Sequence, residues 1–177
     1  MPTSAPSLLG WVFEKVEHLR PTSVLDIGIG FGKYGFLTKE YASVRHPASL
    51  SGCHLVGVEP FQSYITPLCR LIYDEIRIGD ALHMDFSHDK FDLIIMADVI
   101  EHFEKPDGLR LLHDLKKVSK KLIITTPIVF SRQDACFGND YEIHRSVWSI
   151  GDFPGTLIDT SQSGCIFGVE LKGDLPD

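Results

Sequence analysis

Residues 24–35, with the sequence VLDIGIGFGKYG, constrain the fold of this chain more than any other stretch. The apolar residues at its start have the length and β-branched content of a buried strand, and the strand runs into closely spaced glycines. Gly28, Gly30 and Gly32 have no Cβ, so each can adopt a positive φ and let a ligand approach the backbone, where amides and a helix N-terminus offer donors. Asp26 precedes this turn and would repel a phosphate. The stretch therefore predicts a strand and a nucleotide-type binding turn whose ligand carries a positive charge.

Strands and helices alternate along the chain between residues 24 and 125. Apolar residues at helical spacing predict helices, and short apolar, β-branched runs predict strands. Such alternation is typical of a parallel sheet covered on both faces, so we predict an α/β, Rossmann-like, doubly wound sheet in three layers, closed by a C-terminal antiparallel β-hairpin. The expected helices are residues 7–19, 33–44, 61–73 and 109–118. The expected strands are residues 24–27, 54–58, 75–78, 91–96, 122–125, 156–159 and 165–171, with residues 160–164 as the hairpin connection.

The length and composition are those of one soluble domain over residues 1–177, with a lead-in helix within residues 1–20. A formal net charge of -7 provides no basic surface for phosphates, so nucleic acid is not an expected partner. No apolar run approaches the roughly 20 residues of a membrane span, so no membrane association is expected. Scattered cysteines and the lack of a signal-peptide pattern favour a cytoplasmic location. The sequence leaves open whether the protein is a monomer or a homodimer.

Acidic residues stand at the ends of the expected strands. In a parallel sheet, ligands bind beyond the carboxyl ends of the strands, near the point where the strand order reverses. Glu59 could accept both hydrogen bonds from a ribose diol. Asp80 could accept a hydrogen bond from the amino group of adenine while the Ala81 amide donates to a ring nitrogen. With Asp98 after the fourth of these strands, the residues predict an adenosine lying across the strand ends.

The same residues give the chain a resemblance to the class I S-adenosylmethionine-dependent methyltransferases. The matching motifs are DxGxGxG at residues 26–32, VGVE at 56–59, GDA at 79–81 and FDLIIMADVIEHF at 91–103. In that family the glycine turn wraps the methionyl part of the cofactor, the first-strand acid lies near its amino group, and the second-strand acid binds the ribose hydroxyls. The resemblance implies S-adenosyl-L-methionine as the cofactor, whose sulfonium and ammonium suit an acidic pocket. The cofactor-binding residues it implies are Asp26, Gly28, Ile29, Gly30, Gly32, Glu59, Pro60, Asp80, Ala81 and Asp98.

Two other functions stay open on the sequence alone. Gly30, Gly32 and Gly35 also fit a dinucleotide-binding fingerprint, so an NAD-dependent oxidoreductase is one alternative. In such an enzyme, Asp26 and Asp80 would have no evident role. The other alternative is a non-catalytic module that keeps the cofactor pocket for sensing or for supporting a partner subunit. Four motifs in the right order favour a methyltransferase that acts on a small-molecule acceptor.

Asp98, Glu101 and His102 are spaced to lie on one side of a starting helix, near the expected methyl group. Methyl displacement needs alignment of the reactants and removal of a proton, so His102 is the candidate catalytic base. The acid and histidine pair favours O-methylation. Alternatively, Asp98 and Glu101 could form a capping box, with His102 as a packing residue of the first helical turn.

Residues 127–149 are rich in large side chains and are expected to form a lid on the acceptor side. The segment resembles the family region with an HxxxWS pattern that borders the acceptor pocket, which implies substrate-side roles for Tyr141, His144 and Trp148, together with Glu101. Trp148 could instead be a core anchor, with Ser149 as a helix cap. No metal is expected, because the histidines lack zinc spacing and Thr-Thr-Pro at 125–127 stands where metal-dependent relatives carry ligands.

Overall fold

The computed structural model describes residues 3–43 and 52–176. In this part of the chain, seven strands form one sheet in the order β3-β2-β1-β4-β5-β7-β6. β1 lies between β2 and β4, so the strand order reverses beside β1. The strands are β1 (Ser23–Ile27), β2 (His54–Glu59), β3 (Glu75–Ile78), β4 (Phe91–Ala97), β5 (Ser119–Pro127), β6 (Leu157–Ser163) and β7 (Ile166–Lys172).

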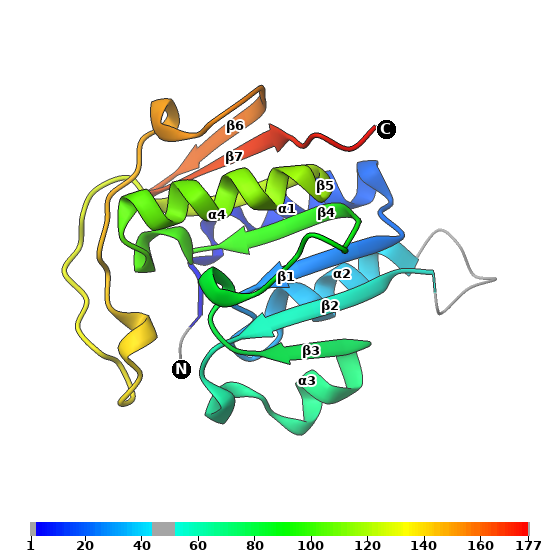
Figure 1. Cartoon of the computed structure of the whole chain (residues 1–177), viewed down its shortest axis with the longest axis horizontal. Helices are drawn as coiled ribbons and strands as arrows, with labels where there is room; N and C mark the ends of the chain where they lie inside the picture. Colours follow the sequence, from blue (N-terminus) through cyan, green and yellow to red (C-terminus); the bar gives the residue numbers. More distant parts are fainter. Residues whose placement is uncertain (1–2, 44–51, 177) are drawn as a thin grey trace.

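The first five strands are parallel, and their carboxyl ends meet at one edge of the sheet (Figure 1). At the centre, Leu25 of β1 pairs with Val56 of β2 and with Ile94 of β4. β7 runs antiparallel between β5 and β6, so the C-terminal hairpin closes the sheet. The predicted Rossmann-like, doubly wound α/β fold is confirmed, and its ligand site is expected beyond the end of β1.

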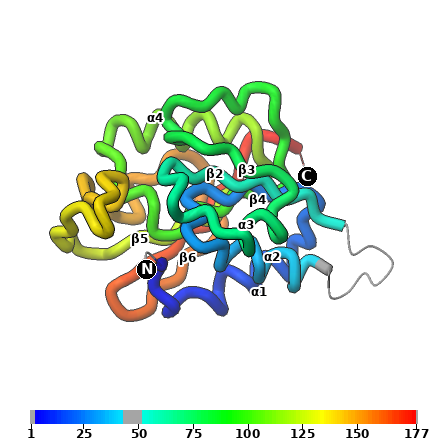
Figure 2. The backbone as a smooth tube through the Cα atoms, turned by 90° about the horizontal axis from the view of Figure 1, so that it is seen from below, coloured from blue at the N-terminus to red at the C-terminus, as the bar shows by residue number. Residues whose placement is uncertain are grey.

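Helices cover both faces of the sheet, with α4 on one side and α1 and α2 on the other (Figure 2). Successive strand residues alternate between two buried cores, because side chains along a strand point to opposite faces. Leu25 packs in the core that includes Leu112 of α4, whereas Val24 packs in the core that includes Val12 of α1. The helices are α1 (Leu9–Leu19), α2 (Lys33–Ser43), α3 (Pro67–Ile72) and α4 (Lys105–Lys117).

The single helix expected over residues 61–73 is wrong. The segment forms a short 3-10 turn, Gln62–Tyr64, and then α3. Pro67 has no amide hydrogen and disfavours helical backbone in the residue before it, so a helix cannot run through this point. Thr66 is extended and its hydroxyl accepts a hydrogen bond from the Cys69 amide at 3.3 Å. The proline therefore starts a new helix, with Thr66 as its cap.

The C-terminal hairpin also differs from the sequence expectation. The predicted connection at residues 160–164 is too long, because β6 continues to Ser163 and Gly164 and Cys165 form the turn before β7. Gly164 has a φ of 61°, which the tight turn of a hairpin favours. The described part of α2 reaches Ser43, and the expected last residue of that helix, Val44, lies outside the described residues.

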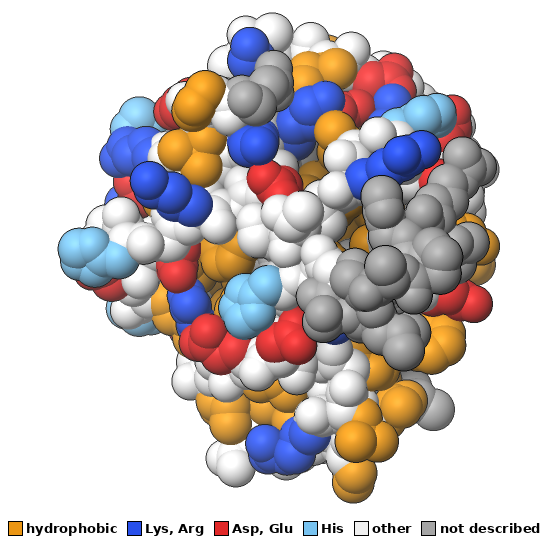
Figure 3. Space-filling view, turned by 90° about the vertical axis from the view of Figure 1, so that its right-hand side faces the viewer, with side chains coloured by type: hydrophobic (Ala, Val, Ile, Leu, Met, Phe, Trp, Pro, Cys, Tyr) orange, Lys and Arg blue, Asp and Glu red, His pale blue; other side chains and the backbone are white. Residues whose placement is uncertain are grey.

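The segment between β5 and β6 extends past the carboxyl ends of the parallel strands, on the same side as the first described residues (Figure 1). The opposite end of the molecule shows acidic and basic side chains interspersed with one another (Figure 3). The features that could form a ligand site therefore gather at the carboxyl end of the sheet.

Within residues 3–43 and 52–176, no helix combines the length and the apolar character that a membrane span requires.

Candidate functional site

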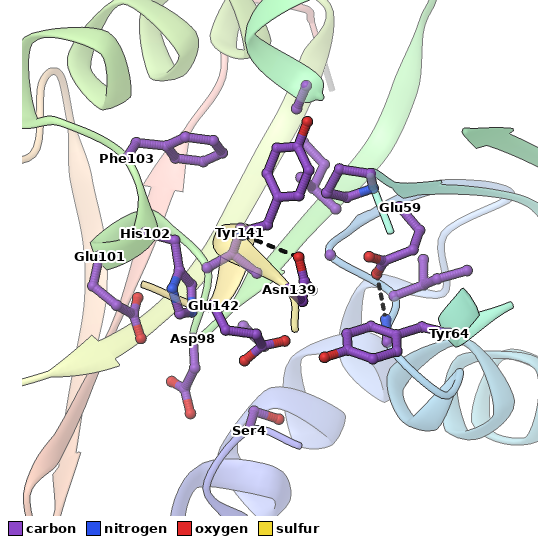
Figure 4. Close-up of a pocket in the computed structure, with 18 of the residues that line it drawn as sticks. Ser4, Glu59, Tyr64, Asp98, Glu101, His102, Phe103, Asn139, Tyr141 and Glu142 are labelled. Carbon is purple, nitrogen blue, oxygen red and sulfur yellow. Dashed lines mark hydrogen bonds between the residues drawn. The ribbon is translucent and has the colours of Figure 1, made fainter. Parts of the chain in front are cut away.

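A cavity of about 750 Å³ lies at the carboxyl ends of the parallel strands. The turns after β1, β2, β3 and β4 form one wall, and residues within 133–145 form another. Glu59 and Tyr64 lie toward one end of the cavity, and Glu101 and His102 toward the other (Figure 4). The predicted site residues that line it are Gly28, Ile29, Gly30, Glu59, Pro60, Asp80, Ala81, Asp98, Glu101, His102, Tyr141 and His144.

Asp26 is buried below the glycine turn and does not line the cavity. Its carboxylate accepts a hydrogen bond from the Tyr73 hydroxyl at 2.6 Å. Burial raises the pKa of Asp26 to about 7, against the opposing effect of that hydrogen bond. Asp26 therefore lies outside the cavity lining, and its predicted contact with a positively charged part of the ligand stays a prediction.

Gly32 and Trp148 are the other predicted site residues that the cavity excludes. A Cβ at Gly32 would contact Cys69 and Tyr73 at 3.5 Å, so this glycine faces the α3 side of the protein. Trp148 is 2% exposed, and its indole nitrogen donates to the Ser146 hydroxyl at 2.8 Å. Trp148 is thus a core anchor, and the substrate-side role implied for it is wrong.

The turn after β1 has the backbone geometry that its glycines predict. Gly28, Gly30 and Gly32 all have a positive φ, at 76°, 50° and 87°. A Cβ at Gly28 would fall well inside van der Waals contact with Val99, so only glycine lets this turn and the loop after β4 approach each other. At Gly28 and Gly30 the turn therefore presents backbone without a side chain at the end of β1.

Glu59 bridges this turn and the end of β2. Its two carboxylate oxygens accept hydrogen bonds from the Gly30 amide at 2.9 Å and the Phe61 amide at 3.0 Å (Figure 4). Burial raises the pKa of Glu59, and the two amide bonds oppose that effect. Each carboxylate oxygen can accept a second hydrogen bond, so Glu59 can still receive two donors from a ligand.

Asp80 caps the 3-10 turn that follows β3. Its side chain accepts a hydrogen bond from the Leu82 amide at 2.9 Å. Asp80, Ala81 and Leu82 all line the cavity, so capping does not remove Asp80 from the site. The turn presents a carboxylate and an apolar side chain together, which is a suitable surface for a purine.

The capping box expected from Asp98 and Glu101 is wrong. Asp98 has a left-handed backbone, with a φ of 54°, and the 3-10 turn Ile100–His102 begins after Val99 without a side-chain cap. The carboxylate of Asp98 accepts from the Thr125 hydroxyl at 2.7 Å and from the Ala5 amide at 2.8 Å. Asp98 therefore joins the N-terminal segment to the end of β5 at the cavity wall.

Glu101, His102 and His144 form a compact group at the end of the cavity near β4 and β5. Glu101 is 3% exposed and accepts a hydrogen bond from the Thr126 hydroxyl at 3.0 Å. Burial, and then the nearby charge of Asp98, raise the pKa of Glu101 to about 8. The rings of His102 and His144 lie 4.9 Å apart. Burial, and then His144, lower the pKa of His102 to about 4, so its imidazole is neutral at pH 7.

Several cavity residues were not predicted from the sequence. Tyr34 follows the glycine turn, Tyr64 lies in the 3-10 turn after β2, and Asn139 and Glu142 lie in the segment after β5. The position of Tyr34 directly after the glycine motif is a signal that could have identified it. No sequence pattern marks the other three, because their approach to the strand ends depends on how the loops fold.

Comparisons with known proteins agree with this fold. A model of the family described as "Methyltransferase domain" matches residues 25–122. An uncharacterized protein of Methanocaldococcus jannaschii, MJ0638, is 28% identical over 142 residues, which are 80% of this chain and 57% of that protein. The chain thus spans little more than half the length of this curated relative.

Solved structures show the same fold at low sequence identity. The PH0226 protein from Pyrococcus horikoshii OT3 has a TM-score of 0.69 and 20% identity, over 95% of this chain and 88% of that one. The N-terminal domain of EvdMO1, crystallised in the presence of SAH (S-adenosylhomocysteine) and D-fucose, has a TM-score of 0.59 and 13% identity, over 91% of this chain and 82% of that one.

The family match covers more than half of the chain, so the chain belongs to the methyltransferase domain family. Its sheet and strand-end cavity are those of the class I S-adenosylmethionine-dependent methyltransferases. S-adenosylmethionine is the cofactor of this class, and the exposed glycine backbone and the two-oxygen acceptor Glu59 fit it. The family match does not support the NAD-dependent alternative.

Proposed function

We propose that this protein transfers the methyl group of S-adenosylmethionine to a hydroxyl oxygen of a small-molecule acceptor. The observation that carries the proposal is one cavity of about 750 Å³ with two chemically different ends. Glu59 and the glycine turn lie at one end, and Glu101 and His102 lie at the other (Figure 4). A cavity of this kind can hold a nucleoside cofactor and a second, small molecule at the same time.

The end near β1 and β2 would bind the adenosine. Glu59 would accept both ribose hydroxyls, because each of its oxygens retains acceptor capacity beside the Gly30 and Phe61 amides. Asp80 would accept from the adenine amino group, while Leu82 covers the base. The glycine turn would contact the methionyl part through its backbone. These assignments extend the sequence prediction, although Asp26 and Gly32 do not line the cavity.

The end near β4 and β5 would bind the acceptor. The cavity wall there includes Tyr141 and His144 from the segment expected to act as a lid, which would enclose a small acceptor. EvdMO1, whose fold is similar, was crystallised with the sugar D-fucose. This neighbour supports a small hydroxyl-bearing acceptor for the present chain as well.

When bound, the cofactor would supply an electrophilic methyl group, whose carbon an acceptor lone pair would attack while S-adenosylhomocysteine leaves. The residues of the chain therefore have to align the acceptor and manage one hydroxyl proton. His102 donates its Nδ1 hydrogen to the Ile143 carbonyl at 3.2 Å, which leaves Nε2 without a proton. A role of His102 in handling that proton stays a prediction.

Isothermal titration calorimetry with S-adenosylhomocysteine tests the cofactor half of the proposal. We expect the wild-type protein to bind it and not to bind NAD. Glu59→Gln should weaken binding about tenfold or more, since a charged acceptor of two ribose hydroxyls is lost. The matched control is Glu14→Gln, on the exposed side of α1, which should leave the affinity unchanged. Equal affinity of the Glu59→Gln variant and the wild type would contradict the assignment.

Transfer of a labelled methyl group to a panel of hydroxylated small molecules tests the catalytic half. The enzyme should label at least one hydroxylated acceptor. Binding of the cofactor without transfer to any acceptor, in a panel that also includes amines, would favour the non-catalytic alternative instead.

A further inference from the structure

Glu101, His102 and His144 bring one ligand atom each within 4.8 Å of one another at the acceptor end of the cavity. We propose that these three residues bind a divalent transition-metal cation, of the class of Mn²⁺, Fe²⁺, Co²⁺ or Zn²⁺. The sequence predicted no metal, and that prediction relied on ligand spacing along the chain. The structure brings His144 to Glu101 and His102 from a distant segment, so spacing could not reveal the group.

Both histidines are held as metal ligands are usually held. The Nδ1 atom of His102 lies 3.2 Å from the Ile143 carbonyl, and that of His144 lies 2.7 Å from the Ser131 carbonyl. A carbonyl can only accept, so each Nδ1 carries the hydrogen and each Nε2 keeps a free lone pair. Backbone carbonyls that fix the second ring nitrogen in this way orient the imidazole of a metal-binding histidine.

Glu101 provides the negative ligand. One oxygen accepts from the Thr126 hydroxyl at 3.0 Å, and the other makes no hydrogen bond with another described residue. Although Glu101 is 3% exposed, it forms no ion pair within the described residues. An ionised carboxylate in such a place is costly unless a cation neutralises it, and a bound metal would be that cation.

The surrounding charges favour a cation as well. Asp98 and Glu142 lie on the same side of the cavity as Glu101 (Figure 4), and both act on it electrostatically. Two positive side chains also line the cavity. Lys33 interacts electrostatically with Asp98 and donates to the Ser4 carbonyl at 2.7 Å. Arg145 is exposed, and its guanidinium donates to the carbonyls of His102 and Asp140, so solvent screens its charge.

Two imidazoles and one carboxylate are typical ligands of transition metals, and leave coordination positions open. Ligand atoms of a tetrahedral site with bonds of ~2.1 Å lie about 3.4 Å apart, so the side chains would move inward on binding. All three residues line the cavity, so the open positions would face the acceptor.

If the proposed function holds, an acceptor hydroxyl would occupy an open position of the cation. The metal would lower the pKa of that hydroxyl, as it does for bound water, and the proton would pass to solvent water. This part of the inference rests on the proposed function. The binding of the cation itself does not.

Cobalt titration of tag-free protein, stripped with EDTA, tests the site through the visible absorption of bound Co²⁺. We expect one Co²⁺ per chain, and at least tenfold weaker binding in His144→Ala and in Glu101→Gln. His113→Ala, which removes an exposed histidine on α4, should bind as the wild type does. The absence of saturable binding, or equal binding by His144→Ala and the wild type, would overturn the proposal.

Affinity for S-adenosylhomocysteine, measured in EDTA on the same variants, shows that loss of Co²⁺ binding is not loss of the fold. We expect His144→Ala to keep that affinity. If the cofactor analogue binds and Co²⁺ does not, the metal site fails and the proposed function stands. If Co²⁺ binds and the analogue does not, the metal site stands and the proposed function fails.

Discussion

Asp26 and Tyr73 form a buried hydrogen-bonded pair directly beneath the glycine turn. The hydroxyl of Tyr73 donates to the Asp26 carboxylate at 2.6 Å, and both side chains are at most 5% exposed. Burial raises the pKa of Asp26 to about 7, from 3.8 for the free side chain. Protonated Asp26 is therefore favoured by folding, so its contribution to stability is complete below about pH 4 and is lost as the pH rises through 7.

Asp26→Asn should remove this pH dependence, because the amide stays neutral and its oxygen can still accept from Tyr73. Relative to the wild type, the variant should gain on the order of 2–4 kcal/mol in the free energy of unfolding between pH 4 and pH 8. Urea denaturation of both proteins across this range measures the difference. A constant difference at all pH values would show that Asp26 has an ordinary pKa in the folded protein.

At the scale of elements, α2 packs closely on Tyr73, the residue that follows α3. A Cβ on Gly35 of α2 would fall well inside van der Waals contact with the Tyr73 ring and hydroxyl. Gly35 therefore fits a structural need for close packing, and its place in a dinucleotide fingerprint is coincidental.

Gly35→Ala should destabilise the protein by about 1–3 kcal/mol, since Tyr73 has to move and its hydrogen bond with Asp26 is strained. Gly10→Ala is the matched control, because Gly10 is also helical and a Cβ there would meet no atom within 4 Å. The free energy of unfolding of that variant should rise by roughly 0.5–1 kcal/mol, because alanine has a higher helix propensity than glycine. Chemical denaturation measures both changes, and stabilisation by Gly35→Ala would refute the packing argument.

Helices and strands could be predicted from the sequence where apolar residues recur at regular spacing. The strand expected from Val24 and the helix expected up to Leu19 are both present. The single helix predicted over residues 61–73 was wrong because the prediction took no account of Pro67, where a new helix starts. The segment after β5 gave no periodic signal, so the sequence could place Tyr141 and His144 near the site but could not separate them from Trp148, which is a core residue.

For the whole molecule, the sequence identified the cofactor end of the cavity better than the acceptor end. Glu59 and Asp80 follow strands, and the topology of a parallel sheet brings strand ends together. The sequence could not show that Asp26 lies outside the cavity lining, because a position next to the glycine turn does not reveal which way a side chain points. The group of Glu101, His102 and His144 needed the folded loop, since its third member comes from another part of the chain.

A crystal structure with S-adenosylhomocysteine tests the central claim most directly, namely that the strand-end cavity holds the cofactor at one end and the acceptor at the other. The ribose should contact Glu59, the adenine should lie against Asp80 and Leu82, and the sulfur should point toward Glu101 and His102. Binding of the ligand outside this cavity, or with its sulfur directed away from Glu101 and His102, would contradict the account.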